Sequence, residues 1–173
     1  MQRIVILGTT GSGKSWLAAR LAARLGLHVV DLDALFWGPD WQPVPVELFR
    51  YRVECEIREG GWIVAGNYYQ VRDLVWEAAD TLVWLDLPLP LVMARLLRRT
   101  ARRIVTREDL WGTGNRETAG RSFFSRQSIL LWALKTHSRN RARFFADSER
   151  LAKTKRVVRL QSRREVERFA EAA

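Results

Sequence analysis

Short apolar runs alternate with segments of helical periodicity along this 173-residue chain. The runs are continuous in apolar residues, which is typical of strands buried on both faces of a sheet. The predicted strands are residues 3–7, 28–33, 62–66, 81–87 and 155–161. Between the first two, Leu17, Leu21 and Leu25 repeat every four residues, as on one face of a helix. A helix is therefore expected over residues 14–25.

Further helical segments follow the later strands. One helix is expected to end at Gly60, with Phe49, Val53 and Ile57 on one face. Others are expected around 71–78, at about 91–105 and at about 122–150. A last helix is expected after Ser162, which forms an S-x-x-E capping box with Glu165. Three prolines exclude regular structure from residues 34–45. Strands that alternate with helices predict a single α/β domain with a parallel sheet and right-handed crossovers. Ligands of such folds bind beyond the carboxyl ends of the strands.

The segment after the first strand, GTTGSGKS, matches the phosphate-binding pattern G-x-x-x-x-G-K-[ST]. Its glycines let backbone N–H groups turn towards phosphate oxygens, and the helix amino terminus adds the positive end of its dipole. Lys14 is expected to reach the β- and γ-phosphates, and the Ser15 hydroxyl to ligate Mg²⁺. The predicted nucleotide-binding residues are Gly8, Thr9, Thr10, Gly11, Ser12, Gly13, Lys14 and Ser15. This segment predicts a nucleoside triphosphate site.

Two carboxylates, Asp31 and Asp33, stand at positions i and i+2 at the end of the second predicted strand. In a strand, this spacing places both side chains on one side at the ligand end. One carboxylate can hold Mg²⁺, and the other can accept the proton of an attacking hydroxyl. The alternative is that one of them only caps the loop that follows.

The net charge of +10 is located in one segment. Residues 95–143 contain 13 lysines and arginines against three acids, whereas the rest of the chain is neutral. Such a segment attracts phosphate groups, whether of a triphosphate or of a nucleic-acid backbone. The single cysteine excludes an intramolecular disulfide. No apolar run is long enough to span a bilayer and no leader is recognisable, so a cytoplasmic protein is expected.

These motifs resemble the P-loop small-molecule kinases, the superfamily of adenylate, shikimate and gluconate kinases. They are most similar to the adenylate-kinase-related topology modulation (FlaR-like) proteins of bacteria. The resemblance is carried by GTTGSGKS, DLDALFW, WIVAGNY, WLDLPLPLVMARLLRR, GNRE and SILLWALKTH, which are spread across nearly the whole chain. It implies a P-loop NTPase fold with a five-stranded parallel sheet flanked by helices, and ATP and Mg²⁺ as cofactors. It also implies an acceptor-binding segment at residues 34–60 and an arginine-rich helical lid at residues 95–143.

The resemblance also assigns roles to single residues. In shikimate kinases the first Asp of an Asp-x-Asp lies near Mg²⁺ and the second on the substrate hydroxyl, positions that Asp31 and Asp33 match. In adenylate kinases an R-x-x-x-R pair opens the lid and grips ATP, which Arg95 and Arg99 match. Arg116, in the glycine-containing loop GTGNRE, is a further candidate for stabilising the transferred phosphoryl group.

Two features depart from these families. Ala65 stands where adenylate kinases have an Asp near the metal, which leaves that role to Asp31. Residues 31–49 carry four acids and no lysine or arginine, so an acceptor that is neutral or cationic is expected, rather than AMP. Candidate contacts with this acceptor are Asp33, Trp37, Trp41, Gly66, Asn67, Tyr68 and Arg72. The tryptophans suit packing at least as well, and Arg72 is the one cation expected within reach of an acceptor's carboxylate or phosphate.

The leading prediction is an ATP-dependent phosphotransferase with Mg²⁺-assisted in-line transfer to a small hydroxyl-bearing molecule, and no membrane partner. Two alternatives remain open. The cationic segment also suits a nucleotide-dependent protein that associates with nucleic acid, although no DNA-reading motif is recognisable. The second alternative is a nucleoside monophosphate kinase, which would have to bind the acceptor's phosphate despite the acids of residues 31–49.

Overall fold

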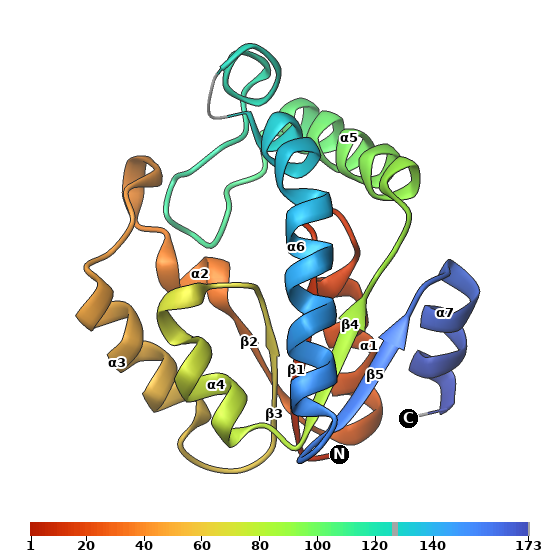
Figure 1. The fold of residues 1–173 in the computed structure, drawn as a ribbon. Helices are drawn as coiled ribbons and strands as arrows, with labels where there is room; N and C mark the ends of the chain where they lie inside the picture. The colour runs from red at the N-terminus through yellow and green to blue at the C-terminus, as the bar shows by residue number, and fades with distance from the viewer. Residues whose placement is uncertain (126–127, 173) are drawn as a thin grey trace.

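The computed structural model describes residues 1–125 and 128–172, which form a five-stranded parallel sheet with helices on both faces (Figure 1). The strands are β1 (Arg3–Gly8), β2 (His28–Asp31), β3 (Trp62–Ala65), β4 (Thr81–Leu85) and β5 (Arg156–Leu160). Their order across the sheet is β2-β3-β1-β4-β5, and every pairing is parallel. The predicted α/β class and the five-stranded sheet are confirmed.

Helices connect successive strands, as the periodicity predicts. They are α1 (Lys14–Leu25), α2 (Leu32–Phe36), α3 (Val46–Ile57), α4 (Arg72–Ala78), α5 (Leu89–Thr106), α6 (Ile129–Leu151) and α7 (Arg163–Ala172). Shorter helical turns cover Pro39–Trp41, Tyr69–Val71 and Gly120–Phe124. The predicted helix over 122–150 is thus divided, and its residues 126 and 127 lie outside the described part. At the start of α7 the Ser162 hydroxyl accepts a hydrogen bond from the Glu165 backbone N–H, as a capping box requires.

The segment after β2 differs from the prediction. The strand ends at Asp31 instead of residue 33, and α2 begins at once. A 3-10 turn also covers Pro39–Trp41, so the prediction of no regular structure over residues 34–45 is wrong. The cause is the side chain of Asp31, which caps α2 by accepting a hydrogen bond from the backbone N–H of Asp33 at 3.0 Å. Pro39 stands at the start of its turn, where a missing N–H does no harm.

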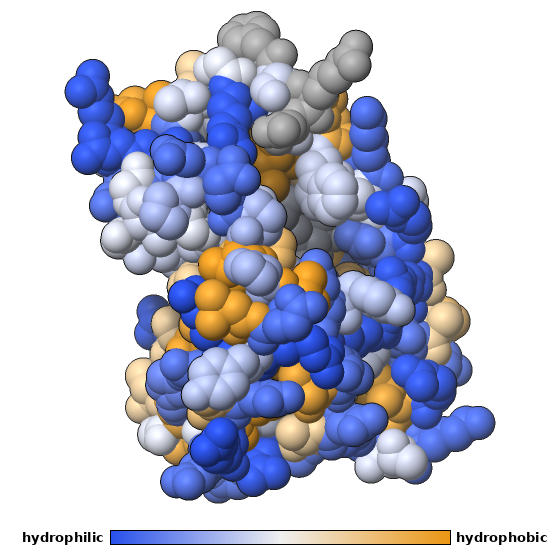
Figure 2. Space-filling model, turned by 90° about the vertical axis from the view of Figure 1, so that its left-hand side faces the viewer, coloured by the Kyte–Doolittle hydropathy of each residue, from blue (hydrophilic) through white to orange (hydrophobic). Residues whose placement is uncertain are grey.

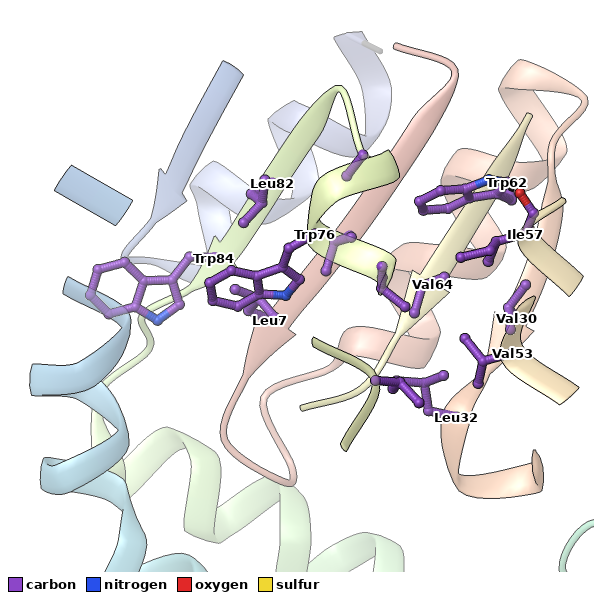
Figure 3. Packing of buried hydrophobic residues seen from close by; sticks show 14 of the residues in the cluster. Leu7, Val30, Leu32, Val53, Ile57, Trp62, Val64, Trp76, Leu82 and Trp84 are labelled. Carbon is purple, nitrogen blue, oxygen red and sulfur yellow. Dashed lines mark hydrogen bonds between the residues drawn. The ribbon is translucent and has the colours of Figure 1, made fainter. Parts of the chain in front are cut away.

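Two hydrophobic clusters hold the helices against the sheet. On one face, β1 to β4 pack against α3, α4 and α6. Figure 3 shows part of this cluster, with Trp76 of α4 near Leu7 of β1 and Val53 of α3 near Val30 of β2. The other face is covered by α1 and α7. The central strand β1 is therefore fixed on both sides, and the loop at its carboxyl end has a rigid base.

Helix α5 and the first part of α6 lie beyond the carboxyl ends of the strands, and the rest of α6 runs down over one face of the sheet (Figure 1). Leu96 of α5 packs against Leu130 and Ala133 of α6. Residues 107–121, here called the lid loop, leave α5 and extend towards α2 and the Pro39–Trp41 turn (Figure 1). Figure 2 shows the face that lies on the left-hand side of Figure 1. On this face hydrophilic residues predominate and apolar residues form separate patches. Among the described residues, no helix is long and apolar enough to cross a membrane.

Candidate active site

The loop between β1 and α1 has the backbone of a phosphate cradle. Gly8, Gly11 and Gly13 have φ angles of +154°, +83° and +99°, which residues other than glycine rarely adopt. At Gly11 a Cβ atom would also lie 2.9 Å from the carbonyl oxygen of Val92 and from Cβ of Leu96. Glycine is therefore required at position 11 both by the turn and by the close approach of α5.

The residues that follow β3 brace this loop. Asn67 Oδ1 accepts a hydrogen bond from the Gly8 backbone N–H at 3.3 Å, and Asn67 Nδ2 donates to the Gly8 carbonyl at 2.5 Å. Lys14 Nζ donates to the same carbonyl at 2.9 Å. Asn67, expected from the sequence to contact the acceptor, instead bonds to the backbone of the phosphate loop. Its role in this geometry is to position Gly8.

Several polar groups around the loop suit an anionic ligand. Burial lowers the pKa of Lys14 to about 8, an effect that nearby Asp33 opposes and Arg99 strengthens. Ser12 Oγ and Arg99 Nε are buried and have no hydrogen-bond partner among the described residues. Ser15 is exposed in the first turn of α1. Phosphate oxygens would supply the missing acceptors and the missing negative charge, so the loop fits a nucleoside triphosphate.

Asp31 lies near Lys14, but it arrives there through the helix cap and not through strand alternation. One carboxylate oxygen bonds to the Asp33 backbone N–H, and the other accepts from Trp111 Nε1 of the lid loop at 3.4 Å. Burial raises the pKa of Asp31 and the charge of Asp33 raises it further, whereas Lys14 opposes the rise. A cation beside Asp31 would relieve this penalty, which fits Mg²⁺.

The donors present also fit the coordination of Mg²⁺. Among the described residues, no group of three or more His, Cys, Asp or Glu could hold a metal ion. Mg²⁺ commonly binds through one or two protein groups together with substrate phosphates. Asp31 and the Ser15 hydroxyl are the residues of this chain that would hold it beside the phosphate loop.

Asp33 is exposed in the first turn of α2, and Tyr68 fixes its carboxylate. Tyr68 Oη donates to Asp33 Oδ1 at 2.6 Å. Burial raises the pKa of Tyr68 far above its ordinary value, and the charge of Asp33 adds to the rise, so the phenol stays a donor. The ring of Tyr68 packs against Phe36 and Phe49 at centroid distances of 4.5 and 5.2 Å. Asp33 and Tyr68 thus lie together as expected of acceptor contacts, and their role at an acceptor stays a prediction.

Two arginines reach the phosphate loop from α5. Arg95 donates to the Ser12 carbonyl at 3.1 Å. Arg99 interacts electrostatically with both Lys14 and Asp33, and its pKa is lowered by burial and by the neighbouring Arg103. Both arginines therefore lie beside the phosphate loop, and that they grip ATP stays a prediction. Arg116 is exposed in the lid loop, and its role at the transferred phosphoryl group stays a prediction.

The tryptophans of the acceptor segment pack against other aromatic rings. Trp37 lies edge-on to Phe36 and Trp41 at centroid distances of 4.9 and 5.9 Å. Trp41 is also edge-on to Trp111 at 6.0 Å, with the guanidinium of Arg121 4.8 Å from its centroid. The packing alternative for these residues is therefore observed, and it does not prevent Trp37 from lining an acceptor.

Gly66 and Arg72 take structural positions. Gly66 has a φ of +155°, and a Cβ there would lie 2.8 Å from Cβ of Leu32, so glycine lets α2 approach β3. Arg72 forms an ion pair with Asp147 of α6, and its guanidinium lies 3.7 Å from the ring centroid of Trp76. Arg72 is thus engaged between α4 and α6, and the structure does not bring it to Asp33.

Many charges of residues 95–143 are used inside the protein. Arg103 pairs with Glu117 at 3.0 Å, and Arg141 pairs with Asp86 at 2.8 Å. Arg159 also pairs with Asp86. Burial would raise the pKa of Asp86, but the hydrogen bonds from the two arginines outweigh it and hold that pKa below its usual range. Arg95, Arg99, Arg103 and Arg141 thus serve the fold or the phosphate loop, while other arginines of this segment are exposed. No contact among the described residues supports the predicted nucleic-acid association.

Two residues of the lid loop make contacts near the site that no sequence pattern predicted. Trp111 contacts Asp31, as described above, and Asn115 contacts the backbone of the acceptor segment at Gly38 and Trp41. These contacts span 74 to 80 residues of sequence, so no local pattern marks them. The motif GNRE, which contains Asn115, was a signal of family resemblance but gave no role to that residue.

Comparisons with known proteins agree with this geometry. No protein-family model matches the chain. It is 31% identical over 142 residues to a shikimate kinase of Paramagnetospirillum magneticum, a match that covers 73% of this chain and 70% of that protein. A shikimate kinase of Rhodopseudomonas palustris is 28% identical over 127 residues, which cover 64% of this chain and 62% of that protein. The chain therefore spans about two thirds of the length of these relatives.

Solved structures with the same fold are also kinases. A shikimate kinase from Bacteroides thetaiotaomicron has a TM-score of 0.56 at 15% identity, covering 99% of this chain and 95% of the other. A gluconokinase from Sinorhizobium meliloti 1021 has a TM-score of 0.52 at 19% identity, covering 99% and 94%. At these identities the likeness concerns the fold alone. The closer resemblance to topology modulation proteins is addressed by none of these matches and stays a prediction.

Proposed function

The chain belongs to the P-loop small-molecule kinase superfamily that includes the shikimate kinases, and from this we propose an ATP-dependent kinase whose acceptor is an uncharged or cationic hydroxyl compound. Phosphoryl transfer to a small hydroxyl-bearing molecule follows from the family, and neither alternative, nucleic-acid association or a nucleoside monophosphate kinase, is favoured. The acceptor class is inferred from this chain's own residues. The observation that carries the proposal is that Lys14 and Arg99 lie close enough to Asp33, beside the phosphate loop, to interact with it electrostatically.

In this proposal the residues divide the work between the two substrates. The loop from Gly8 to Ser15 holds the nucleotide phosphates, and Lys14, Arg95 and Arg99 stabilise the charge that develops during transfer. Mg²⁺, when bound by Ser15 and Asp31, would neutralise phosphate charge. Asp33 accepts the proton as the acceptor oxygen attacks the γ-phosphorus and ADP leaves.

The acceptor class rests on the cations that follow the acidic residues 31–49 in the sequence, and on the partners that these cations have. No lysine or arginine occurs in residues 31–49. Arg50, the next cation, donates to both carboxylate oxygens of Asp73 at 2.8 and 2.7 Å. Arg52 donates to the Leu35 carbonyl, and Arg72 pairs with Asp147. An acceptor carboxylate or phosphate would have to displace one of these partners or bind Arg121, whose guanidinium lies over the ring of Trp41. An uncharged or cationic acceptor could instead bind directly to Asp33 and the aromatic rings around it.

The test is ADP release from MgATP by the purified protein, alone and with a panel of acceptors. The panel contains neutral polyols and sugars, amino sugars, shikimate, gluconate and the common nucleoside monophosphates. Lys14→Met is the blank for nucleotide chemistry and Asp33→Asn the blank for the acceptor. We expect release that depends on Lys14 and is stimulated by a neutral or amine-bearing member of the panel.

Two results would contradict the proposal in different ways. Stimulation by shikimate, gluconate or a monophosphate would overturn the acceptor class but retain the kinase. If neither the panel nor a pooled small-molecule extract stimulated release, although MgATP was bound, phosphoryl transfer itself would be excluded as the function.

A further inference from the structure

Residues 37–43 form a tight loop at the end of α2. The Gly38 backbone N–H donates to the Gln42 carbonyl at 2.8 Å, and Trp37 and Pro43 form an antiparallel bridge. The loop begins four residues after Asp33. Its conformation therefore affects α2, whose first turn carries the carboxylate of Asp33.

Residues 109–115 form a second tight loop, which belongs to the lid. The Leu110 backbone N–H donates to the Asn115 carbonyl at 2.9 Å, and the Gly114 N–H donates to Asp109 Oδ1 at 2.9 Å. The backbone of Asn115 is thus fixed within its own loop. Its side chain is free to project from the loop and contact another element.

The two loops are joined through the side chain of Asn115. Its Oδ1 accepts from the Trp41 backbone N–H and its Nδ2 donates to the Gly38 carbonyl, both at 2.8 Å. Asn115 is only 2% exposed, so both ends of a buried amide are satisfied by backbone groups of the acceptor segment. Removing this side chain would leave two backbone groups without partners.

Tryptophans on either side of this junction reinforce it. Trp41 and Trp111 pack edge to face at 6.0 Å. Both have left-handed backbone, with φ of +58° and +60°, which is unusual for bulky residues and is held only where surrounding contacts determine it. Trp111 also donates to Asp31. The lid loop therefore contacts the acceptor segment at its backbone and at an aromatic ring, and it also contacts the carboxylate of Asp31 at the end of β2.

We propose that Asn115 is a positioning residue of the acceptor site, and that through it the lid and the acceptor segment form one unit. The lid loop follows α5, which carries Arg95 and Arg99, and residues 37–43 follow α2, which carries Asp33. Contacts made by the phosphates with α5 are thereby transmitted to the acceptor side. This inference rests on the proposed function for the identity of the two ligands, but the junction itself does not.

The test is backbone amide exchange of residues 38–44, with and without Mg²⁺ and the non-hydrolysable ATP analogue AMP-PNP. The variants are Asn115→Ala, which removes both bonds, and Asn115→Asp, which keeps the acceptor for the Trp41 N–H but loses the donor to Gly38. Thr113→Ala is the matched control, because the Thr113 hydroxyl bonds within the lid loop itself, to the Leu110 carbonyl.

We expect the Trp41 amide to exchange at least tenfold faster in Asn115→Ala than in the wild type or Thr113→Ala, with Asn115→Asp between them. Mg²⁺ and AMP-PNP should slow exchange of residues 38–44 in the wild type and not in Asn115→Ala. Equal exchange in all variants, or an equal effect of nucleotide with and without Asn115, would overturn the inference. If AMP-PNP did not bind the wild type, the proposed function would fail while the exchange rates without nucleotide still decided the junction.

Discussion

The Tyr68 hydroxyl donates a hydrogen bond to Asp33 Oδ1 at 2.6 Å and so joins the segment after β3 to the first turn of α2. The bond uses one carboxylate oxygen and leaves the other for an acceptor hydroxyl. Because burial and the charge of Asp33 raise the pKa of Tyr68 far above its ordinary value, the phenol stays protonated at neutral pH and donates this bond. The pair therefore holds a candidate base in a single orientation.

Asp33→Asn should lower the turnover of the acceptor at least 100-fold while leaving the Kd of MgATP within about threefold. The substitution keeps the size of the side chain and removes its ability to take a proton. Turnover is measured as acceptor-stimulated ADP release, and binding by isothermal titration. Undiminished turnover would exclude Asp33 as the base.

Tyr68→Phe separates orientation from proton transfer. The phenylalanine ring can keep the contacts with Phe36 and Phe49, so only the hydrogen bond to Asp33 is lost. We expect a loss of turnover of about tenfold, consistent with one hydrogen bond to a charged group. A loss as large as that of Asp33→Asn would assign Tyr68 a direct part in the chemistry.

Lys14→Met should abolish ADP release and yet stabilise the fold at pH 7. The pKa of Lys14 is lowered to about 8 by burial, below its unfolded value, so the charged lysine disfavours the folded state at pH 7. That penalty is fully present below pH 8 and is removed as the pH rises towards the unfolded pKa. The variant should gain about 1–3 kcal/mol of unfolding free energy at pH 7 and little at pH 10. Urea unfolding at both pH values checks this, and a less stable variant at pH 7 would contradict it.

Gly11→Ala should weaken MgATP binding at least 100-fold, because the new methyl group would meet Val92 and Leu96 of α5 at 2.9 Å. Gly26→Ala is the matched control. Gly26 also has a positive φ, +65°, but nothing lies within 4 Å of its Cβ position, so only conformational strain of about 1 kcal/mol is added. Isothermal titration of both variants with MgATP separates crowding from strain. Equal affinities would show that α5 does not confine the loop.

Asp86→Asn should destabilise the protein by roughly 2–3 kcal/mol, because the buried carboxylate that accepts charged hydrogen bonds from Arg141 and Arg159 is lost. The pKa of Asp86 is held low, so its contribution is present above the unfolded pKa of about 4 and is lost as the pH falls through the lowered value. Asp73→Asn, at an exposed pair with Arg50, should cost less than about 1 kcal/mol. Urea unfolding at pH 7 and pH 3 compares the two, and similar losses at pH 7 would contradict the distinction.

The carboxylates illustrate where local pattern was sufficient and where it was not. Spacing correctly marked Asp31 and Asp33 as neighbours of the phosphate loop, but it predicted strand alternation where a helix cap occurs. A capping aspartate and a strand-end aspartate have the same sequence signature here. What separates them is whether the backbone N–H two residues later turns back, and that depends on how α2 packs on β3 at Gly66 and Leu32.

Arg72 and Asn67 also show that the partners of a residue cannot be predicted from its place in the sequence. Both follow β3 and were natural candidates for the acceptor, yet Arg72 pairs with Asp147 and Asn67 bonds to Gly8. Each partner lies on an element distant in sequence. A side chain's neighbourhood at the end of a strand contains several such elements, and sequence order alone does not rank them.

By itself, the sequence determined the order of strands and helices and the phosphate-binding loop, because hydrophobic periodicity and the φ angles open to glycine are properties of short segments. It also determined that residues 31–49 carry four acids and no lysine or arginine. Only the tertiary structure decided which polar groups meet there. The bonds of Asn115 to Gly38 and Trp41 span 77 and 74 residues. Such contacts exist only where two loops, each stabilised within itself, are brought together beyond the carboxyl ends of the strands, because α2 follows β2 and α5 follows β4.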